Sequence, residues 1–210
     1  PIQVHFSTTN QLGKIYISSG NNFLSSMTLY QRWQTILQQN PENLALTDWK
    51  SGRSWTFDGI QRELECRKTA PKGTVLFPRA WQVDLIFETL RAWRDGAILC
   101  PVESTAPNAG LFHGIPDGIA HVKMTSGSTA KPKFVLFTGK QLAADAANVT
   151  ETMGLHPDCP NLGVISMAHS YGFSNLVTPL LLHGVPLLWV GDPLPGSLSA
   201  AFAKMETPCA

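Results

Sequence analysis

The part of the sequence whose residue types most directly suggest chemistry is residues 125–133, which read TSGSTAKPK. Four hydroxyl side chains and a glycine stand close together, and a lysine closes the run. Hydroxyls and backbone N–H groups in a tight loop can converge on a compact anion, and a lysine adds a positive point charge. This segment therefore predicts a loop that binds phosphate groups.

Two other interpretations of this loop fit the sequence less well. It is not a Walker A loop, because the GxxxxGK[ST] spacing is absent. A flexible Ser/Gly linker is the structural alternative. The Lys-Pro-Lys ending and the apolar, strand-like segments on both sides favour the phosphate loop over the linker.

A second candidate segment is residues 167–173, which read MAHSYGF. It follows a buried-type strand pattern and precedes a helical pattern, a position at which α/β proteins often place ligand-binding groups. His169 in this segment carries an imidazole, which can donate or accept a hydrogen bond. The alternative is an ordinary loop histidine whose aromatic neighbours belong to the core.

The elements that must position these segments alternate along the chain. Apolar residues at helical spacing cover residues 29–37, 57–64, 83–93, 142–153 and 173–181. Strand-like stretches cover residues 44–49, 54–56, 74–77, 97–102, 121–124, 133–137, 162–166 and 185–190. Capping boxes at Thr28 and Thr138, a Thr cap at Thr56 and a glycine stop at Gly96 support the helix boundaries. Pro179 is expected to kink or restart the last helix. The order predicts an α/β fold with a mainly parallel sheet flanked by helices.

Composition excludes several function classes. The formal net charge is +1, and no basic run is interleaved with aromatic residues, so we expect no nucleic-acid partner. The longest apolar stretches are strand-sized and predict no membrane span. The four cysteines are far apart without a CxxC pair, and the histidines form no HxxxH or HExxH pattern, so neither a disulfide framework nor a metal site is expected. We expect a cytoplasmic protein.

The loop resembles the signature phosphate loop of the adenylate-forming (AMP-binding, acyl-CoA synthetase or ligase) superfamily. That loop runs Ser/Thr-Ser/Thr-Gly-Ser/Thr-Thr-Gly-x-Pro-Lys, and eight of its nine positions agree with residues 125–133. The departure is Ala130, where the family has glycine. If that position needs a positive φ, alanine costs about 1–2 kcal/mol.

The resemblance extends roughly from residue 40 to residue 200. Residues 44–60 resemble the family's early strand pair, which leads into a helix through an aromatic-Thr-aromatic step. Residues 85–102 resemble its helix-to-strand passage, which ends in a proline, here Pro101. The expected division is an N-terminal part of strands and a helix, residues 1–40, and a partial AMP-binding α/β domain, residues 41–210. This corresponds to the first half of the family's large N-terminal domain.

The resemblance also implies roles for individual residues. His169 would be the catalytic candidate beside the reacting carboxylate, and the acid pocket would be shaped by His169, Tyr171, Gly172 and Phe173. The residues implied to surround the phosphates of the cofactor ATP are Thr125, Ser126, Gly127, Ser128, Thr129 and Lys133. Mg²⁺ would accompany ATP, with its ligands mostly outside this chain.

The implied reaction is ATP-dependent activation of a carboxylic acid to an acyl-adenylate, followed by thioester formation with coenzyme A or a carrier-protein thiol. No Asp lies in residues 161–190 to pair a substrate ammonium, which favours a fatty or aryl acid over an amino acid. A homodimer is one further expectation.

These residues lack the family's Gly-Tyr-Gly-x-Thr-Glu and Thr-Gly-Asp segments and the adenylation lysine. We therefore expect the 210-residue chain alone to be inactive. The alternatives are a non-catalytic nucleotide- or acyl-binding module of the same fold and a generic α/β domain whose loop matches by coincidence.

Overall fold

The computed structural model describes residues 26–107, 112, 114–125, 133–191, 194, 196 and 199–200. Within these ranges the helices are α2 (Leu29–Gln39), α3 (Phe57–Glu65), α4 (Asp84–Asp95), α5 (Gly139–Thr152), α6 (Ser170–Gly172), the π-helix η2 (Phe173–Val177) and α7 (Thr178–His183). The strands are β1 (Leu44–Asp48), β2 (Arg53–Thr56), β3 (Val75–Leu76), β4 (Ile98–Leu99), β5 (Ile119–Thr125), β6 (Lys133–Thr138), β7 (Asn161–Gly163) and β8 (Leu187–Trp189). The expected alternation of strands and helices is confirmed.

The strands divide into two four-stranded sheets within the described residues. One has the order β2-β1-β8-β7 and the other has the order β3-β4-β5-β6. The pairs β1–β8, β7–β8, β3–β4 and β4–β5 are parallel, while β1–β2 and β5–β6 are antiparallel hairpin pairs. The mainly parallel character is therefore as predicted, but it is shared between two sheets instead of lying in one.

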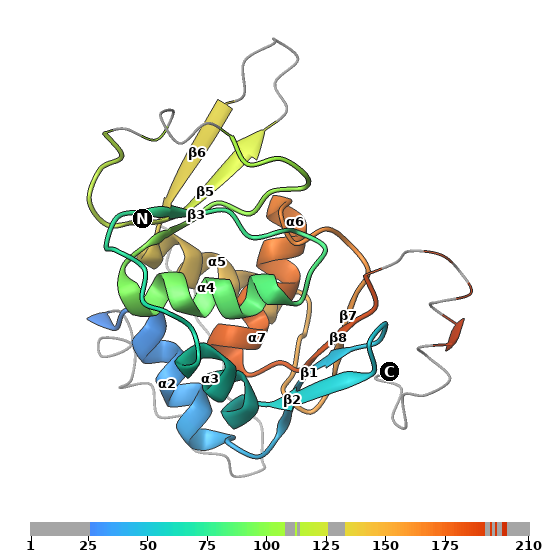
Figure 1. The fold of residues 1–210 in the computed structure, drawn as a ribbon. Helices are drawn as coiled ribbons and strands as arrows, with labels where there is room; N and C mark the ends of the chain where they lie inside the picture. The colour runs from blue at the N-terminus through green and yellow to red at the C-terminus, as the bar shows by residue number, and fades with distance from the viewer. Residues whose placement is uncertain are drawn as a thin grey trace, which may run out of the picture.

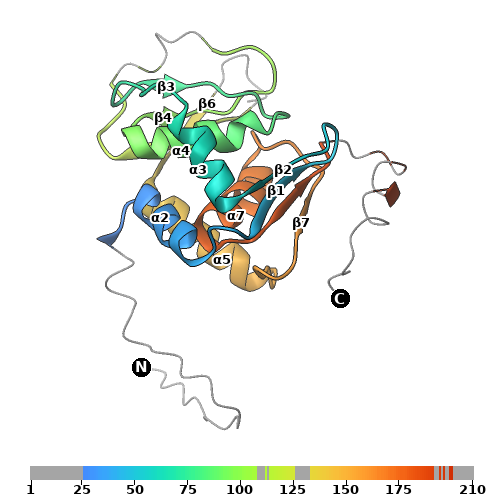
Figure 2. The same cartoon turned by 60° about the horizontal axis from the view of Figure 1, so that its bottom comes forward.

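Helices fill the space between the two sheets (Figures 1 and 2). Helix α4 contacts β4 and α5 contacts β5, while α3 contacts β1 and β2 of the other sheet. The main hydrophobic cluster joins these helices and includes the fully buried Trp33, Phe57 and Phe173. A smaller cluster of Ile98, Cys100 and Val122 is formed by β4, β5 and their surroundings.

The predicted helix boundaries rest on local hydrogen bonds that the structure contains. Thr28 Oγ1 accepts from Gln31 N at 3.2 Å, and Thr28 N donates to the Gln31 side chain at 2.8 Å. Thr138 forms the same capping box, and Thr56 Oγ1 accepts from Gly59 N at 3.0 Å. Gly96 ends α4 in the left-handed conformation with φ of 68°. These starts and stops need only residues within one turn of each other.

The helical pattern of residues 173–181 is divided between two elements, and Pro179 explains the division. Proline has no N–H, so the carbonyl of Asn175 cannot be paired by an α-helical bond to that residue. Asn161 Nδ2 donates to this carbonyl instead, at 2.5 Å. Residues 173–177 adopt the wider π-helix, and α7 restarts with Pro179 in its first turn. The predicted restart at Pro179 is confirmed.

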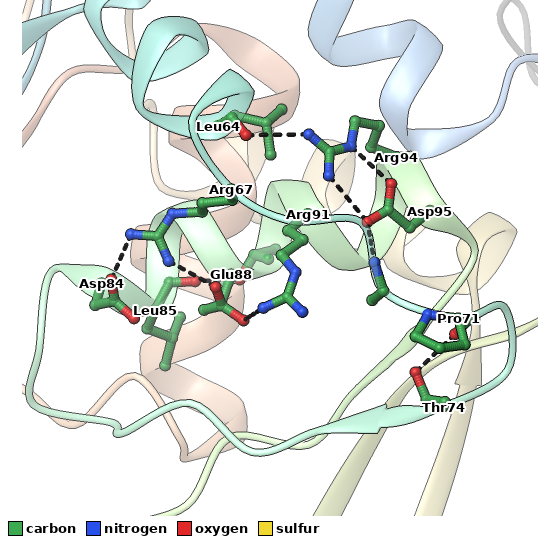
Figure 3. A network of polar contacts seen from close by, with 12 residues as sticks. Leu64, Arg67, Pro71, Thr74, Asp84, Leu85, Glu88, Arg91, Arg94 and Asp95 are labelled. Carbon is green, nitrogen blue, oxygen red and sulfur yellow. Dashed lines mark hydrogen bonds and ion pairs between the residues drawn. The ribbon is translucent and has the colours of Figure 1, made fainter.

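A network of charged side chains fastens the segment after α3 to helix α4 (Figure 3). Arg94 binds both carboxylate oxygens of Asp95, at 2.7 and 3.0 Å, and donates to Leu64 O at 3.0 Å. The backbone N–H of Ala70 donates to Asp95 Oδ2 at 2.7 Å. Hydrogen bonds from Arg94, followed by the one from Ala70, lower the pKa of Asp95 despite its burial. This network ties the end of α3 and the approach to β3 to the end of α4.

Two expectations from composition can be compared with the described residues. None of their helices has the length and apolarity needed to cross a membrane. Cys66 is an exposed free thiol and Cys100 a buried one. Burial raises the pKa of Cys100 to about 12, which keeps it protonated. Cys159 is disulfide-bonded, whereas the sequence predicted no disulfide framework.

Candidate functional site

The predicted phosphate loop spans the tip of the β5–β6 hairpin. Thr125, the last residue of β5, is paired in register with Lys133, the first residue of β6. Opposite residues of antiparallel strands have Cα atoms about 4.5–5.5 Å apart, so the two ends of the loop are held together. The other predicted phosphate ligands, Ser126, Gly127, Ser128 and Thr129, lie outside the described residues, as do the side chains of Thr125 and Lys133.

The donor set of this hairpin tip suits a polyphosphate. Hydroxyls, backbone N–H groups and one lysine are the groups that bind phosphate in a tight loop, and the strand pair holds their attachment points in one place. Figure 1 shows β5 and β6 side by side on one edge of their sheet, with the C-terminal end of β5 and the start of β6 directed away from helices α4 and α5. The chemistry of the residues present therefore fits the phosphates of ATP.

The base of the same hairpin contacts the second candidate segment. The ring of His121 on β5 lies 4.2 Å from the ring of Phe173, centroid to centroid. Strand β5 continues four residues from His121 to Thr125, which is about 13 Å at 3.3 Å per residue. The start of the loop at Thr125 and the contact of Phe173 with His121 therefore lie on the same strand, about 13 Å apart.

His121 and Lys123 are unusual polar residues in this interior. Both are buried, and neither ring nitrogen of His121 has a hydrogen-bond partner among the described residues. Burial, with a smaller contribution from the charge of Lys123, lowers the pKa of His121 to about 3, so the ring is neutral near pH 7. Lys123 Nζ lies 4.6 Å from the centroid of the Phe137 ring, and burial lowers its pKa while Asp145 opposes that shift.

His169 lies at the N-terminus of the short helix α6, with its side chain exposed. Its Nε2 atom is 3.4 Å from Glu103 Oε1. Ser166 Oγ donates to the same Glu103 oxygen, and Trp81 Nε1 donates to Glu103 Oε2 at 2.6 Å. Glu103 thus gathers side chains from the segment before α4 and from the loop after β7 around one carboxylate.

The other three predicted pocket residues have different environments. Tyr171 is 62% exposed, whereas Phe173 is fully buried in the main core against His121. Gly172, the last residue of α6, is buried against the loop that precedes the helix. A Cβ atom at Gly172 would lie 1.9 Å from the carbonyl oxygen of Ser166. The structure therefore brings His169 and Tyr171 to the surface, while Gly172 and Phe173 support them from beneath.

A cavity of about 730 Å³ lies at the carboxyl ends of β1 and β8, with Trp81 and Trp189 in its wall. Their ring centroids are 6.0 Å apart. Ligands of α/β proteins commonly bind at the carboxyl ends of parallel strands, and the volume is in the range of small-molecule sites. Because Trp81 also binds Glu103, one side chain links this cavity to the surroundings of His169.

Glu103, Ser166 and Trp81 are the residues of this region that the sequence analysis did not identify. The available signal was the position of Glu103 directly after the predicted strand 97–102, at the end where parallel sheets carry functional groups. The absence of Asp from residues 161–190 is also weaker evidence against an amino-acid substrate than the sequence analysis assumed. A carboxylate does stand beside His169, but it comes from Glu103, in the loop after β4.

Comparison with known proteins places this site in a family context. The profile of the family described as "AMP-binding enzyme" matches residues 83–206, more than half of the chain. No curated protein sequence matches the chain. Among solved structures, the N-terminal subdomain of NpsA from Klebsiella oxytoca in complex with anthranilyl-AMSN is similar, with 20% identity and a TM-score of 0.64. The match covers 83% of this chain and 58% of that chain.

Two further solved structures are similar. One is NpsA-ThdA, an artificially fused adenylation-PCP di-domain NRPS from Klebsiella oxytoca, with 19% identity, a TM-score of 0.65, and coverage of 82% of this chain and 44% of that one. The other is VinN, with 14% identity, a TM-score of 0.62, and coverage of 78% and 56%. The chain therefore spans about half the length of the solved proteins that it resembles, and their likeness establishes its fold.

Proposed function

Because the chain belongs to the family of AMP-binding enzymes, we propose that its residues bind the phosphates of ATP and a carboxylic acid as part of an adenylate-forming ligase. The observation that carries this proposal is the hairpin of β5 and β6, which closes residues 125–133 into a loop by pairing Thr125 with Lys133. The loop is rich in phosphate donors, and the segment around His169 adjoins the same strand.

In this proposal the loop holds the β- and γ-phosphates while the acid attacks the α-phosphate. ATP, accompanied by Mg²⁺, supplies the adenylyl group and the pyrophosphate leaving group. Fixed hydroxyl and N–H donors stabilise the charge that develops on the departing pyrophosphate without having to reorganise. Lys133 adds a positive charge at the end of the loop, and His169 with Tyr171 would border the bound acid from the surface of α6.

The substrate and the thiol acceptor are the finer parts of the proposal. We propose an aryl or fatty acid as substrate, and the aryl-adenylate analogue in the similar NpsA structure supports the aryl choice. The acceptor is the thiol of coenzyme A or of a carrier protein. The fusion of the similar NpsA to a PCP supports the carrier protein.

A replacement of Lys133 by alanine tests the phosphate loop. Hydrogen bonds to charged groups contribute about 1.5–3 kcal/mol, so we expect K133A to weaken ATP binding by roughly 10- to 100-fold. The dissociation constant of ATP can be measured by titration calorimetry of the 210-residue chain. Because the lysine stands at the start of β6, its loss should leave the hairpin pairing intact.

Lys140 provides the matched control. It is exposed in the first turn of α5, and K140A makes the same change of charge away from the loop. We expect its ATP affinity to stay within about twofold of the wild type, as is usual for an exposed charge. Equal affinities for K133A and K140A would argue that the loop matches the family pattern by coincidence.

We also propose that the 210 residues alone do not complete adenylation, because they span only 44–58% of the similar NpsA chains. ATP–pyrophosphate exchange with a panel of aryl and fatty acids measures this directly. Exchange above background by the purified chain would overturn this part of the proposal.

A chain that binds ATP without exchange would fit either the ligase or the second candidate, a non-catalytic binding module. Exchange by a longer form of the protein would separate the two. The replacement of glycine by Ala130 is the observation that favours that second candidate.

A further inference from the structure

Glu103 is the hub of a hydrogen-bonded cluster that lies beside the exposed ring of His169. Its Oε2 accepts from the Trp81 indole N–H at 2.6 Å, and its Oε1 accepts from Ser166 Oγ. The Ser166 hydroxyl in turn accepts from Ala168 N at 3.2 Å, so its own hydrogen is directed to Glu103. The carboxylate is therefore held from two sides, and its Oε1 faces His169 Nε2 at 3.4 Å.

The chemistry of these partners restricts the imidazole. An ionised carboxylate only accepts hydrogen bonds, so a ring nitrogen facing it must carry a hydrogen. Because that nitrogen is Nε2, the neutral ring is left with an unprotonated Nδ1. Nδ1 of His169 has no partner among the described residues, and the ring is largely exposed. The free nitrogen is then available as a hydrogen-bond acceptor for a ligand.

We propose that Glu103, oriented by Trp81 and Ser166, is the positioning residue of His169. It holds the neutral imidazole as the Nε2–H tautomer, so that Nδ1 accepts a hydrogen bond from a donor group on the bound acid. The ligand-facing part of this inference rests on the proposed function, whereas the tautomer does not. Among the aryl and fatty acids of the proposed function, the Nε2–H tautomer favours those that carry a hydroxyl or amino group within reach of Nδ1.

The replacement of Glu103 by glutamine tests the tautomer, because it places a hydrogen-bond donor opposite His169 Nε2 instead of an acceptor. The Trp81 indole nitrogen is only a donor, so the glutamine oxygen must face it and the NH₂ group must face Ser166 and His169. The Ser166 hydroxyl can accept from that NH₂, and His169 Nε2 must then accept as well. We therefore expect E103Q to convert His169 from the Nε2–H to the Nδ1–H tautomer.

The measurement is a long-range ¹H–¹⁵N correlation spectrum of the ¹⁵N-histidine-labelled 210-residue chain near pH 8, with the His169 signals identified by their loss in H169Q. The double variant W81F/E103Q removes the obligatory donor, so the amide can turn over and the Nε2–H tautomer should return. This rescue separates tautomer control from a structural effect, because a loosened fold would not be repaired by removing a second side chain.

His156 and Asp158 offer a second His–carboxylate contact as a control, although here the backbone N–H of Asp158 also donates to His156 Nδ1 at 3.3 Å. His156 Nδ1 lies 3.1 Å from Asp158 Oδ2, and both side chains are exposed. D158N should change the signals of His156 and leave those of His169 unchanged, while unchanged His121 signals report that the fold is intact. An Nδ1–H tautomer in the wild type, or an Nε2–H tautomer retained in E103Q, would overturn the proposal. Neither outcome depends on ATP binding, so this test can fail without the proposed function failing.

If E103Q does not fold, E103D offers a second variant. Its shorter side chain cannot reach both Trp81 and His169, so it is expected to give a mixture of tautomers. A pure Nε2–H form in E103D would count against the proposal.

Discussion

Replacing Gly172 by alanine is expected to destabilise the chain by about 3 kcal/mol, the upper part of the range for overpacking a filled interior. The added Cβ atom would lie 1.9 Å from the carbonyl oxygen of Ser166 and 2.8 Å from its carbonyl carbon. These are backbone atoms and cannot turn aside as the end of a side chain could. Helix α6 must therefore move away from the loop after β7, which also separates His169 from Glu103. The free energy of unfolding from urea titration measures the loss.

Gly59 is the matched control for this substitution. It lies within α3, and a Cβ atom there would approach no atom closer than 3.4 Å, which is ordinary contact. Alanine is favoured over glycine in a helix interior by about 1 kcal/mol, so G59A is expected to be neutral or stabilising. If G172A proved as stable as G59A, the close approach of α6 to Ser166 would be wrong, and with it the position assigned to His169.

The second large effect is expected for D95A. The Asp95 carboxylate binds Arg94 through both oxygens and accepts from Ala70 N, and its side chain is only 7% exposed. Removing it leaves the mostly buried Arg94 guanidinium without its counter-charge and Ala70 N without this acceptor (Figure 3). Removing one partner of a buried pair costs about 3–5 kcal/mol. Urea titration at pH 7 measures this loss in the free energy of unfolding.

The pH dependence and a surface control sharpen this prediction. Because its hydrogen bonds lower the pKa of Asp95 below 3.8 in the folded state, its stabilising effect is present above that pH and is lost as the pH falls below it. The difference between wild type and D95A should therefore shrink below pH 3.8. D158A removes an aspartate from an exposed contact with His156 and should cost less than about 1 kcal/mol. Equal losses in the two variants would argue that the Asp95 network contributes nothing beyond a surface pair.

Much of the secondary structure was predictable because its signals are local. The capping boxes at Thr28 and Thr138 join residues three positions apart, and both helices begin where those boxes predict. The apolar spacing of α4 and the stop at Gly96 are equally local. The break near Pro179 was also predicted, since a proline removes a backbone donor wherever it stands.

The order of residues 125–133 indicated the resemblance to the family's phosphate loop, and through it the family. This was possible because the hydroxyls, glycine and lysine of the loop stand close together in the chain. The tertiary structure alone decided that the strands form two sheets, that Phe173 packs inside against His121, and that Glu103 meets His169. Glu103 follows β4 and His169 follows β7, and these strands belong to different sheets. Their meeting depends on how the helices pack between the sheets, a long-range arrangement that no local spacing along the chain encodes.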